Sequence, residues 1–224
     1  MGKLLNLMKK KKFVVVVSLP KNDLDLATTS ASCGCDAIKI HTQVVHKASN
    51  THFGSWKEEK SIISKIIKSV KCPVGMVPGA PETLNPDEIE DAAKAGIDFI
   101  DSYDFDMPAW MLKSKRVSKM VAVGEHFQIS DIKALEEMGA DMIEASIINS
   151  NFYGQKLTVR NLENYHRLVK ATKLPVVVPS QKNLSPHDLD QLKSIGIRGV
   201  ILGVIVLGKT QESFKKNLPD YIKG

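Results

Sequence analysis

Apolar and polar positions fall into alternating blocks along the chain, and the blocks predict strands followed by helices. Short continuous runs such as residues 13–20 (FVVVVSLP) and 175–179 (PVVVP) are typical of strands in a parallel sheet that is covered on both faces. Between such runs lie segments with helical spacing, for example residues 56–70, whose isoleucines share one face. This order of elements favours parallel βαβ construction.

The alternation extends over the whole chain. We expect strands at residues 13–20, 37–45, 73–77, 99–103, 120–124, 142–148, 175–179 and 199–202. We expect helices at residues 23–32 and 56–70, from residue 85, near residues 109–115, at residues 130–138 and 159–171, and after each of the last two strands. The sequence therefore predicts a single-domain α/β protein, a (β/α)₈ TIM barrel of residues 13–224, preceded by a lysine-rich leader at residues 1–12.

A weak internal repeat supports closure of the sheet into a barrel. Four expected helices end in a phrase with glycine at its second position, and an apolar strand follows at once. The phrases are residues 33–36 (CGCD), 95–98 (AGID), 138–141 (MGAD) and 195–198 (IGIR). Glycine ends a helix readily because it adopts the left-handed conformation, so each phrase marks a helix-to-strand loop.

The repeat also predicts which side chains point into the barrel. Counted from each glycine, one strand position holds Lys39, Asp101, Glu144 and Ile201, and the position two residues later holds His41, Tyr103, Ser146 and Gly203. Because alternate strands supply interior layers of four side chains, we expect the first set to share one layer and the second set to lie above it, toward the mouth. The residues between them are mostly apolar and should face the outer helices.

One cation and two anions in a single layer are the candidate chemistry. Buried charges must be paired, because an unpaired ion is expensive to remove from water. Such crowding shifts pKa values toward those that proton transfer at neutral pH requires. We expect Lys39 and Glu144 to form an acid/base or polarising pair, Asp101 to orient Lys39, and His41 to shuttle protons. The alternative is a structural ion network with a structural histidine above it.

The loops after the last two strands predict a phosphate site. In β/α barrels these loops often bind phosphate, because glycine lets backbone N–H groups approach an anion and a short helix directs its positive end toward it. The candidate ligands are Ser180, Gln181, Lys182, Gly203, Val204 and Lys209. A second loop, residues 46–55, is interpreted as a lid over the site or as a solvated loop.

Composition excludes several classes of partner. The net charge is +6, but four lysines form one run at residues 9–12, and basic residues do not alternate with aromatic ones, so we expect no nucleic-acid partner. The apolar runs are too short to span a membrane. The three cysteines form no C-x-x-C motif, which indicates packing residues in a cytoplasmic protein. No metal-ligand spacing is present, so we expect neither metal nor cofactor, and a homo-oligomer is left open.

Two segments resemble known phosphate-binding β/α barrels. Residues 199–212 (GVILGVIVLGKTQE) are similar to the last strand and phosphate loop of N-acylmannosamine-6-phosphate 2-epimerase. Residues 96–108 (GIDFIDSYDFDMP) are similar to the fourth strand of the synthase subunit of pyridoxal 5′-phosphate synthase, and thiazole synthase belongs to the same broad group. The resemblance implies the fold and the phosphate site. It does not extend to the reactions, since the lysine or glutamate of those enzymes is replaced around Val77 and at Pro179.

The sequence thus predicts an isomerase or epimerase that acts on a phosphorylated small metabolite, such as a sugar phosphate. Two alternatives remain. Lys39 could act as a Schiff-base nucleophile in an aldolase or lyase, because a lysine desolvated in a barrel can lose its proton and attack a carbonyl. The barrel could also bind a phosphorylated ligand without catalysing a reaction.

Overall fold

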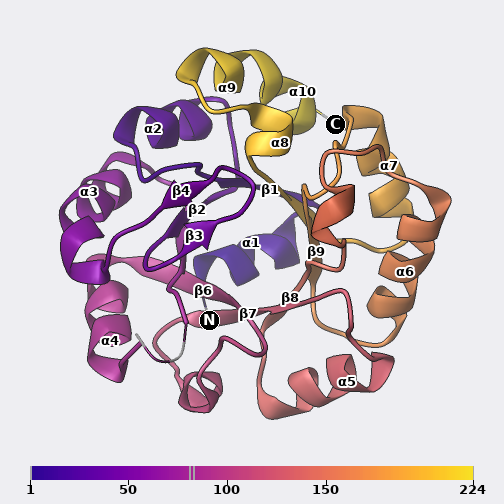
Figure 1. Cartoon of the computed structure of the whole chain (residues 1–224), viewed down its shortest axis with the longest axis horizontal. Coiled ribbons are helices and arrows are strands. Elements are labelled where there is room, and N and C mark those ends of the chain that lie inside the picture. Colours follow the sequence, from indigo (N-terminus) through magenta and orange to yellow (C-terminus); the bar gives the residue numbers. More distant parts are fainter. Residues whose placement is uncertain (1, 81, 83, 224) are drawn as a thin grey trace.

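The computed structural model, which describes residues 2–80, 82 and 84–223, is a closed (β/α)₈ barrel as predicted (Figure 1). The parallel strands follow one another around the barrel in the order β1-β10-β9-β8-β7-β6-β5-β2. They are β1 (Val14–Ser18), β2 (Ala37–His41), β5 (Val74–Val77), β6 (Ile97–Tyr103), β7 (Ser118–Val123), β8 (Met142–Ala145), β9 (Val176–Pro179) and β10 (Gly199–Leu202). Each strand pairs with its neighbours in the chain and the last pairs with the first, so the sheet is closed on itself.

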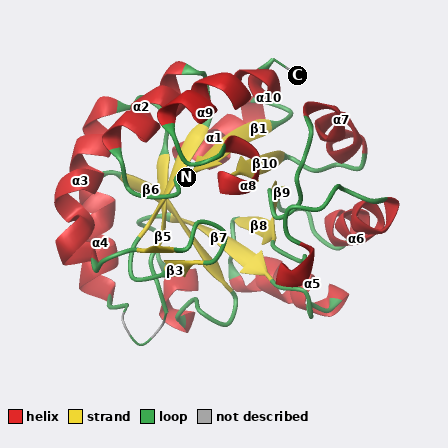
Figure 2. Cartoon of the chain, turned by 45° about the horizontal axis from the view of Figure 1, so that its top comes forward, coloured by secondary structure: helices red, strands yellow, loops and turns green. Residues whose placement is uncertain are grey.

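Helices surround the strands on the outside of the barrel (Figure 2). They are α2 (Leu24–Ser32), α3 (Trp56–Ser69), α4 (Pro86–Ala95), α5 (Ile129–Met138), α6 (Val159–Lys170), α7 (Pro186–Ser194), α8 (Val204–Leu207), α9 (Gln211–Asn217) and α10 (Pro219–Ile222). The side chains of Asn85 and Thr158 accept hydrogen bonds from the first turns of α4 and α6. Within the described part of the chain, none of the helices has the length and apolar character needed to cross a membrane.

Three expected elements differ from the structure. The helix expected near residues 109–115 is a short 3₁₀ helix, η1 (Ala109–Lys113), because so few residues cannot offset the cost of starting an α-helix. The strand expected at residues 37–45 ends at His41, since Gln43 has a left-handed φ of 55° that breaks the extended run. The strand expected at residues 142–148 ends at Ala145, because the backbone bends where Ser146 N–H bonds Glu144 C=O.

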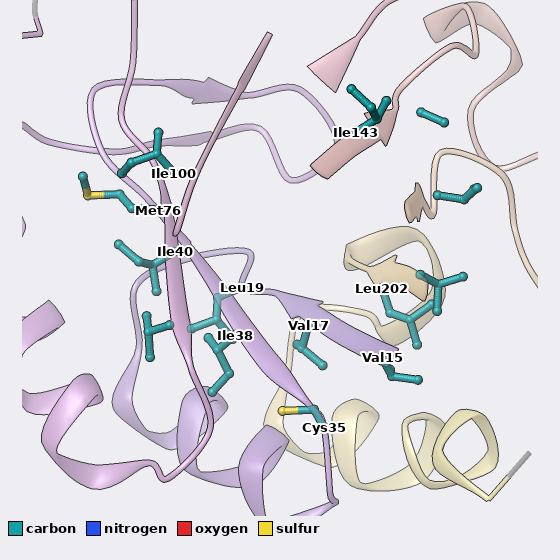
Figure 3. Close-up of a cluster of buried hydrophobic side chains, with 14 of the residues drawn as sticks. Val15, Val17, Leu19, Cys35, Ile38, Ile40, Met76, Ile100, Ile143 and Leu202 are labelled. Carbon is teal, nitrogen blue, oxygen red and sulfur yellow. The ribbon is translucent and has the colours of Figure 1, made fainter. Parts of the chain in front are cut away.

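Side chains alternate between the barrel interior and the layer beneath the helices, as the repeat predicts. Ile38, Ile40, Ile100 and Ile143 point outward into the larger apolar core (Figure 3). A second, smaller core fills the lower interior of the barrel; it comprises Leu4, Leu5, Met8, Val14, Val16, Ala37, Phe99, Met120, Met142, Val177 and Ile201. The interior is therefore packed below the level of the ionic residues.

The expected leader includes a helix that closes the amino-terminal end of the barrel. Helix α1 (Lys3–Lys10) lies across the ring of strands in Figure 1, with Leu4, Leu5 and Met8 buried in the lower core. The sequence does not predict this helix, because its buried stripe consists of only three side chains set among lysines. The helix acts as a plug, because without these three side chains the lower core would be open to water.

The polar residue at the end of each repeat phrase holds this end of the barrel together. Asp98 accepts hydrogen bonds from the first N–H groups of α1, at 2.6 and 2.8 Å, and Arg198 donates to the carbonyl of Met8 in the last turn of the helix. Asp36 accepts from Val15 N–H and Asp141 from Lys119 N–H, each at 2.9 Å. These bonds satisfy donors at a helix start and at strand starts that would otherwise lack partners.

Candidate active site

The carboxyl ends of the strands open into a cavity of about 730 Å³. This volume is within the range of small-molecule sites in proteins. Lys39, Asp101 and Glu144 form its floor, because the barrel interior below these three side chains is filled by the lower core. The loops after the strands form its walls, and a hairpin after β2 reaches over the mouth.

The ammonium of Lys39 lies between two carboxylates. Its Nζ is 2.6 Å from Asp101 Oδ2 and 2.7 Å from Glu144 Oε2, and all three side chains are buried. The three residues come from β2, β6 and β8, so the predicted interior layer is confirmed. We call Lys39, Asp101 and Glu144 the ionic cluster.

The cluster fixes the charge of two of its members. Burial alone would lower the pKa of Lys39, but the negative charges of Asp101 and Glu144 outweigh burial and raise that pKa. Burial would likewise raise the pKa of Glu144, but the charge of Lys39 and hydrogen bonds from the cluster lower it below its ordinary value. Lys39 is therefore an ammonium and Glu144 a carboxylate at neutral pH.

Asp101 differs from Glu144 although it contacts the same ammonium. Burial, and then the negative charge of Glu144, raise the pKa of Asp101 well above its ordinary range, and Lys39 offsets them only in part. The opposite shifts of the two pKa values favour the state in which Asp101 holds a proton and Glu144 does not. In that state the cluster consists of an ammonium, a carboxylate and a carboxylic acid and carries no net charge, which reduces the cost of burying it.

One oxygen atom of the cluster lacks a hydrogen-bond partner among the described residues. Asp101 Oδ1 is buried and has no hydrogen-bond partner among the described residues. Such buried polar atoms are rare in proteins and are often satisfied by water or by a ligand. Among residues 2–80, 82 and 84–223, no three His, Cys, Asp or Glu side chains are grouped in a way that could hold a metal ion.

Two histidines lie above the cluster. His41 Nε2 is 3.5 Å from Ser18 Oγ, and the ring of His41 is 4.7 Å from that of His46 and 4.8 Å from that of Phe53. Burial, and then the neighbouring His46 and Lys39, lower the pKa of His41 well below its ordinary value. Burial and the charge of Lys39 lower the pKa of His46 to about 4. Both rings are therefore neutral at neutral pH.

The upper interior layer forms a hydrogen-bonded wall. The hydroxyls of Tyr103 and Ser146 are 2.7 Å apart, which confirms their predicted position above the cluster. Gln181 Nε2 donates to Ser146 Oγ at 3.0 Å and to Tyr153 Oη at 2.7 Å. The amide of Gln181, expected as a phosphate ligand, is thus engaged in holding the loop after β8. Burial raises the pKa of Tyr103 to about 12, so its phenol keeps its proton.

The expected phosphate ligands fall into two groups. Ser180, Gly203 and Val204 line the cavity, as does Gln181, and Gly203 N–H donates to Ser180 Oγ at 2.8 Å. Lys182 does not line it; its Nζ donates to the carbonyl of Phe152 at 3.3 Å and lies 5.6 Å from the centre of that ring. On this side, the cavity wall thus carries a hydroxyl and backbone groups. Lys182, which was expected to bind the phosphate, does not contribute to this wall.

Lys209 also points away from the expected anion. Its Nζ donates to the carbonyl of Ser49 at 2.8 Å, in the hairpin formed by β3 (Val45–His46) and β4 (Thr51–His52). In this structure Lys209 therefore contacts the hairpin and does not line the cavity. His46 Nδ1 accepts from Ser49 N–H at 3.2 Å, so Ser49 links Lys209 to the histidine above the cluster.

The hairpin is a roof over the cavity. Val44, Val45, His46, Lys47 and Ala48 all line the cavity. The interpretation of residues 46–55 as a purely solvated loop is therefore wrong, and His46 lines the cavity although it was not among the site residues expected from the sequence. The available signal was Phe53, an apolar residue in a polar loop, which is buried against His41.

Replacing Lys209 with methionine is expected to increase opening of the hairpin about tenfold, since a hydrogen bond from a charged donor contributes about 1.5 kcal/mol or more. Amide hydrogen exchange of residues 45–52 measures this opening. Lys216→Met, which removes an exposed lysine from α9, is the control and should leave exchange unchanged. Equal exchange in the wild type and in Lys209→Met would show that Lys209 does not hold the hairpin.

The fold and the position of the cavity define the class of protein: a TIM barrel with a ligand-sized cavity at the carboxyl ends of its strands, where enzymes of this fold have their active sites. Solved structures share this fold. A tryptophan synthase structure from M. tuberculosis superposes with a TM-score of 0.77 at 14% identity, over 100% of this chain and 98% of that chain.

Two further structures give the same result. Thiamine phosphate pyrophosphorylase from Pyrococcus furiosus has a TM-score of 0.65 at 15% identity, over 97% of this chain and 96% of that chain. The YdjI aldolase from Escherichia coli K12 has a TM-score of 0.67 at 13% identity, over 98% and 94% of the two chains. At such identities the likeness confirms the fold alone. No family model matches the sequence, and a search of the curated proteins finds no significant match.

Proposed function

We propose that this barrel is an enzyme that moves a proton on a small phosphorylated carbonyl compound, as an isomerase or epimerase. The observation that carries the proposal is the Lys39 ammonium held between Asp101 and Glu144 on the floor of an open cavity. A carboxylate, a carboxylic acid and a fixed positive charge are together the groups that an enolisation needs.

Each member of the cluster has a role in the proposed reaction. The Glu144 carboxylate removes a proton from the carbon next to the substrate carbonyl, and the C–H electron pair forms the carbon–carbon double bond of an enediol. The carbonyl oxygen takes the proton of Asp101, while the charge of Lys39 stabilises the oxygen as it becomes negative. In an isomerisation, Glu144 then delivers its proton to the former carbonyl carbon, and Asp101 takes a proton from the hydroxyl of the neighbouring carbon, which becomes the new carbonyl. In an epimerisation, the proton instead returns to the other face of the original carbon, and Asp101 takes back the proton of the original oxygen. Asp101 is thus assigned as an acid as well as the partner of Lys39.

The cluster keeps its net charge throughout this sequence. When Glu144 gains a proton and Asp101 loses one, the site still holds one ammonium, one carboxylate and one carboxylic acid. A buried site favours such exchange, because no charge has to be created in a medium that solvates it poorly. His41, whose Nδ1 has no partner among the described residues, can hydrogen-bond a substrate hydroxyl as a neutral ring.

The phosphate of the substrate is proposed to bind beside Ser180, Gly203 and Val204. These residues line the same cavity as the ionic cluster, so one ligand can reach both. The loops after the seventh and eighth strands are the usual phosphate site of this fold. Because Lys182 and Lys209 have other partners, the backbone N–H groups and the Ser180 hydroxyl would bind the phosphate oxygens, and Lys39 supplies a positive charge in the same cavity.

Two observations weigh against the alternatives. A Schiff base requires a neutral amine, whereas the raised pKa of Lys39 keeps it protonated. A purely structural ion network needs no access from solvent, whereas this cluster lies under an open cavity with Asp101 Oδ1 left without a partner in the described part of the chain. Proton transfer fits both observations.

The proposal is tested with a panel of aldose and ketose phosphates in D₂O. The wild type is expected to incorporate deuterium at the carbon next to the carbonyl, detected by proton NMR. Glu144→Gln should lower this exchange at least about 100-fold, the usual contribution of a general base. Glu137→Gln, an exposed change on α5, is the matched control and should retain full exchange.

Two outcomes would contradict the proposed proton transfer. One is deuterium exchange that is equal in Glu144→Gln and the wild type, or absent with the whole panel. The other is a borohydride-stable adduct on Lys39, which would favour the Schiff-base aldolase or lyase.

A further inference from the structure

Two cysteines come together at the plugged end of the barrel, opposite the cavity. Cys35 lies two residues before β2 and Cys72 two residues before β5. These strands are parallel neighbours with Ile38 opposite Val74, and Ile38 N–H donates to Pro73 C=O at 3.0 Å. The two chain segments therefore enter the sheet side by side.

The register brings the two cysteines within bonding range. Extended by two residues, it places Cys72 opposite Asp36, one position beyond Cys35. A strand spacing of about 4.8 Å and a rise of about 3.3 Å per residue then separate the two Cα atoms by about 6 Å. Disulfide bonds are found at Cα separations of this size.

The side chains meet in one apolar layer. Cys35 is buried in the outer core near Ile38 (Figure 3), and Cys72 packs against the same core. Both are free thiols, and each thiol shifts the pKa of the other, as expected of two side chains that lie next to each other. Cysteines that only fill space in the core would not need to lie next to each other.

The two thiols differ in reactivity. Cys72 is partly exposed, whereas Cys35 is buried. The hydrogen bond from Cys35 lowers the pKa of Cys72, and the same bond together with burial raises the pKa of Cys35 well above its ordinary value. Cys72 is therefore the attacking thiolate and Cys35 the thiol that follows.

We propose that Cys35 and Cys72 are a redox-sensitive pair that forms a reversible disulfide with a small-molecule disulfide such as glutathione disulfide. The Cys72 thiolate attacks one sulfur of glutathione disulfide, forming a mixed disulfide and releasing a glutathione thiolate. That thiolate takes the proton of Cys35, and the Cys35 sulfur then attacks the Cys72 sulfur and releases the second glutathione. Two protein thiols are oxidised, and one glutathione disulfide is reduced to two thiols.

The bridge would fasten two neighbouring strands where they begin. It closes the loop from residue 35 to residue 72, which contains α3 and the hairpin, and so restricts the unfolded chain. The bridge would lie before the start of β2, whereas Lys39 and His41 lie farther along the strand, toward the cavity. Oxidation would therefore stabilise the strand without changing the residues that line the cavity. The effect is expected on stability, independent of the proposed reaction.

The test treats the folded, reduced protein with glutathione disulfide at neutral pH, then blocks the remaining thiols and measures the intact mass. Of the three cysteines, only Cys33 is expected to react with the blocking reagent. The protein should therefore carry one blocking group and, apart from that group, be lighter than its reduced form by the two thiol hydrogens. Peptide mapping should locate the bridge between residues 35 and 72. The midpoint of thermal unfolding should rise by roughly 5–15 °C and return to its starting value with dithiothreitol.

Three variants distinguish the pair from a general reactivity of thiols. Cys33→Ser should form the bridge as the wild type does, Cys72→Ser should resist oxidation, and Cys35→Ala should accumulate a glutathione adduct on Cys72. A folded protein that retains all three thiols, or a bridge that includes Cys33, would overturn the proposal. So would oxidation that occurs only after the chain is unfolded.

Discussion

Replacing Lys39 with methionine is expected to lower the free energy of unfolding by about 3–5 kcal/mol at neutral pH, the usual result of removing one partner of a buried ion pair. The variant leaves Asp101 and Glu144 buried without the ammonium that lies within 2.7 Å of each. Their folded-state pKa values should then both exceed the unfolded values of about 4. Urea denaturation at several pH values measures the loss.

The pH dependence of this loss has a definite sign. A carboxyl whose pKa is higher in the folded state contributes stability below its unfolded pKa, and that contribution is lost as the pH rises through the folded value. The difference between wild type and Lys39→Met should therefore be small near pH 4 and full at pH 7.

Lys119→Met is the matched control for this experiment. Lys119 is also a buried strand lysine, and its ammonium is 2.8 Å from Asp141 at the plugged end of the barrel. Asp141 is partly exposed, so water can solvate it when the lysine is removed, and the expected loss is about 1 kcal/mol. An equal loss in both variants, or no loss in Lys39→Met, would contradict the assignment of a special ionic cluster.

Combining Asp101→Asn with Glu144→Gln is expected to cost about 1–3 kcal/mol more than the sum of the two single changes. Each single variant leaves one carboxyl beside Lys39. In Asp101→Asn, Glu144 remains ionised, and in Glu144→Gln, Asp101 can release its proton because the competing anion is gone. The double variant leaves a buried ammonium without an anion, which is the costly state.

Denaturation of the two single variants, the double variant and the wild type completes the cycle. Additive losses would mean that the two carboxyls act independently and share no proton. The same four proteins serve as reagents for the proposed reaction, because the two single changes should impair proton transfer at different steps while the fold persists.

The position of the ionic cluster could be predicted because strands have a period of two residues. Once the glycine phrases fix where each strand begins, the inward or outward direction of Lys39, Asp101 and Glu144 follows. Closure of the sheet then makes their meeting unavoidable. The outward isoleucines follow from the same register, and the structure agrees at every one of them that Figure 3 labels.

Other features depend on contacts that local pattern does not contain. The directions of Lys182 and Lys209 are set by Phe152 and by Ser49, which lie far from them in the sequence. Helix α1 was missed because its lysines dominate the composition, while its three apolar residues find their partners only once the barrel exists. The hairpin that carries His46 requires the left-handed residues Gln43 and Asn50, and neither residue type demands that conformation.

The protonation of Asp101 and Glu144 is the point that most needs direct measurement. Carbon-13 NMR of the labelled carboxyl groups, recorded from acid to alkaline pH and assigned with Asp101→Asn and Glu144→Gln, reports the protonation of each group. At pH 7 one carboxyl of the pair should be protonated and the other ionised. Two ionised carboxylates across the neutral range would contradict the proposed acid and base.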